Sequence, residues 1–134
     1  MAEHVENLNQ PELILVINKP LTWTSFDVVN RLKFFIKNNF PAYKNIKIGH
    51  AGTLDPLATG ILVVCIGKAT KKIEALQNTL KEYTGTIFLG ATTPSYDLET
   101  QSDKTFETGH ITEEQIHDVA QSFIGRQEQV PPIF

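Results

Sequence analysis

Residues 49–60 read GHAGTLDPLATG, and the apolar run ILVVCI at residues 61–66 follows directly. A continuous apolar run closed by Gly67 is typical of a strand that is buried on both faces. The preceding segment is punctuated by Gly and Pro, so we interpret residues 41–60 as a long loop that leads into this strand. Cys65 lies within the run and is therefore expected in the core rather than as a reactive thiol.

Asp55 stands in this loop next to Pro56. A structural role explains such a pair: Asp55 caps a short helix, Pro56 occupies its first position and Gly60 closes the turn. However, positions 19–72 hold nine basic residues and only two acids, of which Asp55 is one. A lone acid on a Gly-rich loop that leads into a buried strand is placed as a catalytic carboxylate would be. The two roles are compatible with each other.

The segments upstream of the loop predict a strand followed by a helix. Leu13–Ile17 is a short apolar run, which indicates the strand. Thr24 with Asp27 three residues later fits a capping box, which indicates the start of the helix. We expect that helix to continue until Pro41 stops it. Its apolar face is expected to be formed by Phe26, Val29, Leu32, Ile36 and Phe40.

Downstream of the loop, residues 73–80 indicate a helix and residues 83–89 alternate as a strand would. The polar segment 92–109 is expected to be loop. Thr112 and Gln115 fit a second capping box, which starts the last helix. The apolar face of that helix and the glycine that ends it are expected at Ile116, Val119, Ala120, Phe123, Ile124 and Gly125.

The last residues, from about 127 to 134, are apolar and strand-like. A strand there needs a partner, and we therefore expect the chain to be the front part of a longer domain. We divide it into a flexible N-terminal segment, residues 1–12, and one domain part, residues 13–134.

Composition restricts the class of protein. The chain has 134 residues, of which 41% are hydrophobic and 20% are charged, as in one soluble globular domain. A single cysteine can form neither an internal disulfide nor a Cys-x-x-Cys site. The polar N-terminus resembles neither a signal nor a transit peptide, and no apolar run approaches the roughly 18 residues of a membrane span. We expect a cytoplasmic protein.

The net charge of −3 conceals an uneven distribution. Residues 1–83 hold ten basic and seven acidic residues, whereas residues 84–134 hold two and eight. The basic part is a candidate for binding nucleic-acid phosphates, although it could equally form solvated faces of helices and loops. The phosphate contacts that we expect are Lys19, Arg31, Lys33, Lys44, Lys47 and Lys68.

Several kinds of site have no support. Residues 67–70 resemble the end of a phosphate loop, but Leu62 replaces its first glycine and Ala69 its hydroxyl residue. The chain contains no G-x-G-x-x-G motif, no Gly-flanked serine elbow and no histidine spacing suited to zinc. A glycosidase with two carboxylates remains open, since acids are frequent after residue 84.

Residues 49–60 resemble the defining motif of the TruB family of bacterial tRNA pseudouridine synthases over twelve consecutive positions. Asn18-Lys19-Pro20 with Thr24-Ser25 is similar to the first motif of the family. Segments 67–71 and 81–83 fall where the family has its equivalents, so the resemblance extends from about residue 13 to residue 134. Thr22 departs from the pattern, because many members have Gly there, and this suggests an altered turn.

The resemblance implies isomerisation of a T-loop uridine in tRNA to pseudouridine, without metal, cofactor or redox change. Asp55 matches the catalytic aspartate, which acts on C1′ directly or along a glycal route. Tyr83 matches the residue that packs on the flipped uracil, with action as a base as a second role, and His50 matches one that holds displaced nucleotides apart. The implied partner is the T-arm of tRNA, and no protein partner or membrane is indicated.

The implied fold is α+β: the pseudouridine synthase core, a mixed, largely antiparallel sheet flanked by helices. Its third motif, Gly-Thr-Tyr-x-Arg, whose arginine pairs with the aspartate, is absent from this sequence. We therefore expect residues 1–134 alone to bind RNA weakly and to be nearly inactive. Two alternatives stay open: a non-catalytic RNA-binding or tRNA-folding module, and a nucleoside or glycoside hydrolase that uses Asp55.

Overall fold

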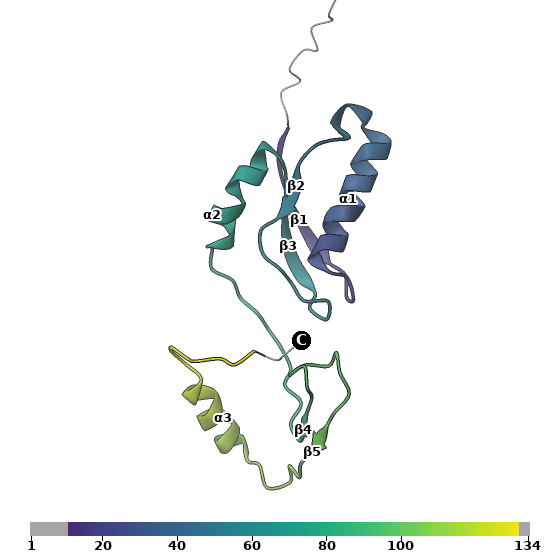
Figure 1. The fold of residues 1–134 in the computed structure, drawn as a ribbon. Helices are drawn as coiled ribbons and strands as arrows, with labels where there is room; N and C mark the ends of the chain where they lie inside the picture. The colour runs from purple at the N-terminus through teal and green to yellow at the C-terminus, as the bar shows by residue number, and fades with distance from the viewer. Residues whose placement is uncertain (1–10, 132–134) are drawn as a thin grey trace, which may run out of the picture. The chain divides into compact units, whose positions relative to one another are not determined.

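The structure, a computed structural model, describes residues 11–131. It divides into two compact units, one ending at Glu82 and one beginning at Tyr83 (Figure 1). Residues 1–10 of the expected flexible segment lie outside the described residues. Glu12, which was assigned to that segment, is already the first residue of a strand.

The first unit contains a three-stranded antiparallel sheet in the order β1-β3-β2. Both predicted strands are confirmed as β1 (Glu12–Lys19) and β3 (Gly60–Gly67), which pair along their whole length. The edge strand β2 (Ile48–His50) lies within the segment predicted to be loop. Because it has only three residues, with a glycine in the middle, it carries no alternating apolar pattern.

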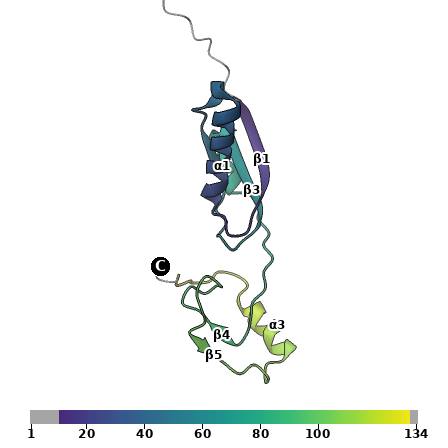
Figure 2. The same cartoon turned by 90° about the vertical axis from the view of Figure 1, so that its right-hand side faces the viewer.

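Helix α1 (Ser25–Asn39) packs against one face of the sheet (Figure 2). The predicted capping box of Thr24 and Asp27 is confirmed. Phe26, however, is 59% exposed rather than on the inner face, since residues 25, 28 and 29 point inward instead. The core joins buried and half-buried residues of α1, the sheet and the loop before β3: Val28, Leu62, Val64, Leu15, Ile17, Leu32, Ile48 and Leu54.

Helix α2 (Ile73–Gln77) follows the 3-10 turn η2 (Lys68–Lys72) and lies on the other side of the sheet from α1 (Figure 1). A Cβ atom on Gly49 would come within 2.9 Å of Ile73 Cδ1, so glycine allows this close approach. Of the helix predicted over residues 73–80, only residues 73–77 are confirmed as helix. Cys65 is buried as predicted, and burial raises the pKa of its thiol.

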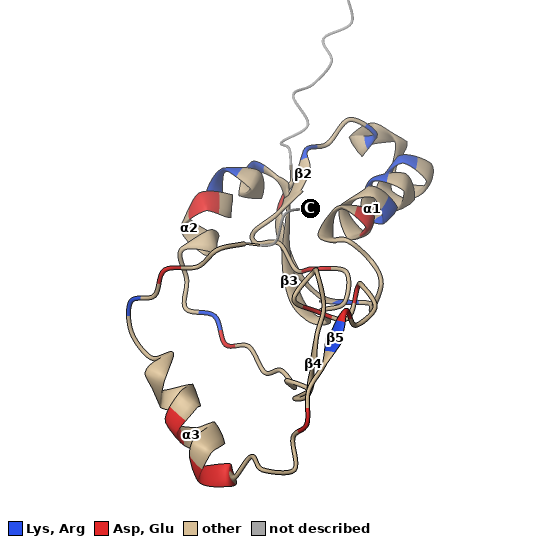
Figure 3. Cartoon of the chain, turned by 60° about the horizontal axis from the view of Figure 1, so that its bottom comes forward, with Lys and Arg blue, Asp and Glu red and all other residues tan. Residues whose placement is uncertain are grey.

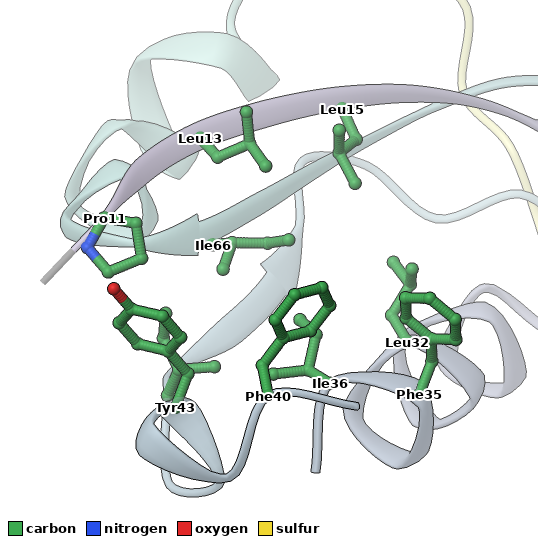
Figure 4. A pocket seen from close by; sticks show the side chains of 10 residues that line it. Pro11, Leu13, Leu15, Leu32, Phe35, Ile36, Phe40, Tyr43 and Ile66 are labelled. Carbon is green, nitrogen blue, oxygen red and sulfur yellow. The ribbon is translucent and has the colours of Figure 1, made fainter. Parts of the chain in front are cut away.

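A second 3-10 turn, η1 (Pro41–Tyr43), follows α1 and closes an apolar hollow of about 250 Å³ between α1 and the sheet (Figure 4). Leu13 and Ile66, which are paired in the sheet, line it together with Phe40 and Tyr43. This pair lies near the Gly67 end of β3, whereas the Asp55 loop joins β3 at Gly60. The hollow thus belongs to the end of the sheet far from Asp55.

The second unit consists of the strands β4 (Ala91–Thr92) and β5 (Lys104–Thr105), paired in a short ladder, and helix α3 (Glu113–Ser122). The capping box of α3 is confirmed. The strand predicted over residues 83–89 is wrong: the segment pairs with nothing in the described part of the chain, and a strand needs a ladder partner. Residues 127–131 form no strand either, and residues 132–134 lie outside the described part.

Candidate active site

The candidate site is the loop that joins β2 to β3. The pairing of β2 continues into it, since the Ala51 N–H donates to the Val63 carbonyl at 2.8 Å. Gly52 and Gly60 adopt φ angles of +120° and +117°, which residues with a Cβ atom rarely take. The motif glycines therefore set the path by which the loop leaves one strand and enters the next.

The end of β1, the turn after it and the first residue of α1 hold this loop through hydrogen bonds. Ser25 Oγ accepts from the Leu54 N–H at 2.9 Å and donates to the Leu54 carbonyl at 3.2 Å. The backbone N–H of Thr22 donates to the Pro56 carbonyl at 2.8 Å. Asn18 Oδ1 accepts from the Gly60 N–H at 3.1 Å. The two sequence motifs, far apart along the chain, thus form one structure.

Asp55 lies between the two held residues Leu54 and Pro56, and its side chain is exposed. Its carbonyl accepts from the Ala58 N–H at 3.0 Å, which makes a single turn in place of the short helix that the sequence suggests. No hydrogen bond or ion pair of the described residues occupies its carboxylate. The backbone around Asp55 is fixed, and its charged group is accessible to a ligand.

Lys19 is buried, whereas its predicted role as a phosphate contact requires an exposed ammonium. Its side chain is 0% exposed, and Nζ donates to the carbonyls of Pro20 at 3.0 Å, Trp23 at 2.5 Å and Pro56 at 3.3 Å. A buried ammonium with three carbonyl partners has no surface to offer a phosphate. The prediction for Lys19 is therefore wrong, because the cation stabilises the turn between β1 and α1.

Replacing Lys19 by methionine should lower the free energy of unfolding by about 1–3 kcal/mol, since carbonyls that lose their donor stay buried. Urea unfolding followed by circular dichroism measures this. Lys71→Met removes a charge from the exposed surface of η2 and serves as the matched control, with an expected change of less than about 0.5 kcal/mol. Equal stabilities of the two variants would contradict the buried role.

Thr22 adopts a φ angle of +68°. This is the left-handed conformation that glycine takes readily. That Thr22 alters the turn relative to the family stays a prediction. A β-branched residue is strained in this conformation.

Thr22→Gly should therefore raise the free energy of unfolding by about 0.5–1 kcal/mol, which is the relieved strain less the added entropy of an unfolded glycine. Thr22→Ala retains the Cβ atom and should give no such gain. Thermal unfolding of the three proteins tests this, and a glycine variant less stable than the wild type would refute it.

His50 and Tyr83 lie in different units. His50, half-buried at the end of β2, donates from Nδ1 to the Gly52 carbonyl at 2.7 Å. His50 thus stands at the start of the loop that carries Asp55. Tyr83 begins the second unit and is 69% exposed. Its place in a common site stays a prediction.

The remaining predicted phosphate contacts are exposed and fall into two groups. Arg31 lines an open hollow of about 480 Å³ with Thr22, Trp23 and Asp27, next to the turn that holds the Asp55 loop, and Lys33 follows it on α1. Lys44, Lys47 and Lys68 lie near the opposite end of β3, where the Gly67 N–H donates to the Lys47 carbonyl. Figure 3 shows basic segments along α1 and before α2, and acidic segments on α3.

Residues 11–131 contain no group of three or more His, Cys, Asp or Glu residues arranged to hold a metal ion. None of their helices combines the length and apolar character needed to cross a lipid bilayer.

The family model described as TruB family pseudouridylate synthase, N-terminal domain, matches residues 39–134. The tRNA pseudouridine synthase B of Flavobacterium johnsoniae is 59% identical over 121 residues, which are 90% of this chain and 53% of that protein. The proteins of the same name from Phocaeicola vulgatus and Chloroherpeton thalassium are 55% and 52% identical, over 90% of this chain and 51% and 48% of theirs. This chain spans about half the length of the curated relatives it matches.

Proposed function

This chain belongs to the TruB family of pseudouridylate synthases, and on that premise we propose that the full-length protein converts a T-loop uridine of tRNA to pseudouridine with Asp55 as its catalytic carboxylate. The observation that supports the proposal is that the backbone around Asp55 is held while its side chain is accessible. Its neighbours Leu54 and Pro56 are held by hydrogen bonds from the start of α1 and from the turn before it, while its own carboxylate is exposed. A fixed backbone and an accessible acid are what attack on a bound sugar requires.

The proposed reaction breaks the bond from uracil N1 to C1′, turns the base and joins its C5 to C1′, while C5 loses its proton and N1 gains one. Substrate and product are isomers, so the reaction needs no co-substrate and no electron acceptor. Asp55 either adds to C1′ or takes part in a glycal route that begins with loss of the 2′ proton. In both routes, an ionised carboxylate next to the sugar stabilises the charge that develops as the glycosidic bond breaks.

The target uridine lies within a folded RNA loop and has to leave its stack before Asp55 can reach the sugar. We assign Tyr83 to packing against the flipped uracil and His50 to holding displaced nucleotides apart. The Nδ1 bond of His50 to Gly52 supports this assignment, since it fixes the ring orientation and directs Nε2 away from that carbonyl. Both roles concern the full-length protein bound to RNA.

Exposed basic residues of the first unit would hold the phosphates of the T-arm: Arg31, Lys33, Lys44, Lys47 and Lys68. Their two groups lie near opposite ends of β3, whose eight residues extend over about 25 Å. A stem-loop is large enough to reach both, and shape rather than base sequence would then select the RNA. Because tRNA is the substrate, we expect the protein to act in the cytoplasm.

The proposal is tested by incubating the full-length protein with a T-arm stem-loop and separating the nucleosides after complete digestion. Pseudouridine should appear at one position, and EDTA should not prevent it. Free uracil in its place would instead identify a nucleoside hydrolase. Tight RNA binding without any product would identify a non-catalytic RNA-binding module.

A further inference from the structure

Ser25 lies at the start of α1 and is 2% exposed. Its hydroxyl both accepts from and donates to the backbone of Leu54, the residue before Asp55. We propose that Ser25 is a positioning residue that fixes the Asp55 carboxylate over its substrate through this backbone clamp. The inference rests on the proposed function of Asp55.

The two hydrogen bonds act on two different peptide groups. The Leu54 N–H belongs to the peptide that joins Thr53 to Leu54, and the Leu54 carbonyl belongs to the one that joins Leu54 to Asp55. A single hydroxyl thus restrains the backbone on both sides of Leu54, at 2.9 and 3.2 Å. The second of these peptides carries the nitrogen of Asp55, so its orientation determines where the carboxylate points.

Packing reinforces the clamp. The Leu54 side chain is half-buried against the core cluster of Val28, Leu62 and Val64, so both its backbone and its side chain are held. Ser25 itself is fixed because it is the first residue of α1, directly after the capping residue Thr24. Through these two hydrogen bonds, the position of α1 determines the position of the Asp55 loop.

The other side of Asp55 is held differently. Lys19 shares its ammonium among three carbonyls, and its contact with the Pro56 carbonyl, at 3.3 Å, is the longest of the three. Thr22 reaches the same carbonyl with its backbone N–H. The Ser25 hydroxyl, by contrast, makes both of its hydrogen bonds to the Leu54 backbone. Its loss therefore frees the backbone directly before Asp55.

The kinetic test compares Ser25→Ala with Thr24→Ala in the full-length protein. Thr24→Ala weakens the same helix end by removing its cap, but it leaves the two bonds to Leu54 in place. With T-arm RNA as substrate, Ser25→Ala should lower kcat about a hundredfold, as expected for a displacement of about 1 Å, with little change in KM. Thr24→Ala should retain the wild-type kcat at a temperature at which both variants are folded. Equal losses of kcat in the two variants would overturn the proposal.

A second readout does not depend on activity. Amide hydrogen exchange of Leu54 should be faster in Ser25→Ala than in the wild type and should be unchanged in Thr24→Ala, because only Ser25 bonds that N–H. An equally slow Leu54 amide in Ser25→Ala would overturn the clamp. If the wild-type protein converts no uridine, the proposed function fails, and the exchange experiment then decides the clamp by itself.

Discussion

Replacing Asp55 by alanine should lower the rate of pseudouridine formation at least about a thousandfold, which corresponds to about 4 kcal/mol of transition-state stabilisation. The loss should appear in kcat rather than in RNA affinity, because the carboxylate acts on the sugar as the glycosidic bond breaks. Single-turnover assays, with the enzyme in excess over the T-arm RNA and above the dissociation constant, measure this step directly. Asp55→Asn should be equally inactive, since the amide has nearly the shape of the acid without its charge.

The structure provides the controls for this experiment. Asp55 is exposed, so its removal should change the free energy of unfolding by less than about 0.5 kcal/mol, and a loss of activity cannot then be attributed to unfolding. Asp118→Ala makes the same change of charge on the exposed surface of α3 and should retain full activity. An Asp55→Ala protein within about tenfold of the wild type would remove the carboxylate from the mechanism, since a key catalytic group contributes several kcal/mol.

The affinity of the full-length protein for the T-arm should fall about five-hundredfold between about 50 and 200 mM salt, if five cations each neutralise one phosphate. The reason is the release of condensed counterions when Arg31, Lys33, Lys44, Lys47 and Lys68 approach the RNA backbone. Fluorescence anisotropy over a salt series gives both the affinity and its salt dependence. Lys19 is left out of this set because its ammonium is buried.

Charge reversal tests one group of these cations at a time. Arg31→Glu with Lys33→Glu should weaken binding at every salt concentration and should reduce the slope of log affinity against log salt by about two. Lys104→Glu changes an exposed cation of the second unit and should leave both quantities as they are. An affinity that does not respond to salt would show that the basic segment is only a solvated face of the protein.

The parts of the fold that the sequence predicts correctly are those whose signals are local. The box of Thr24 and Asp27 starts α1, and the apolar run at residues 61–66 becomes the central strand, because capping and continuous burial depend on neighbouring residues. Strand β2 is missed because its pairing with β3 is tertiary and its three residues show no period. The alternation over residues 83–89 predicts a strand, but the segment forms none. A strand needs a pairing partner, and no local pattern indicates whether one is present.

The same distinction applies to the candidate site. The loop that carries Asp55 is identified by its motif, and its exposed carboxylate agrees with that role. The burial of Lys19 could not be predicted, because lysine is among the residues least often buried and its three carbonyl partners come together only in the fold. The sequence places Ser25 only within a motif, because its contact with Leu54 spans 29 positions of the chain. Such long-range hydrogen bonds leave no pattern in a single sequence.

The most direct test of the central claim is tritium release from a T-arm stem-loop labelled at C5 of its uridines, because C5 loses its hydrogen when it becomes bonded to C1′. The wild-type full-length protein should release one equivalent per RNA molecule and then stop, and the Asp55→Asn protein should release none. Release by Asp55→Asn at the wild-type rate, or no release by the wild-type protein, would contradict the account.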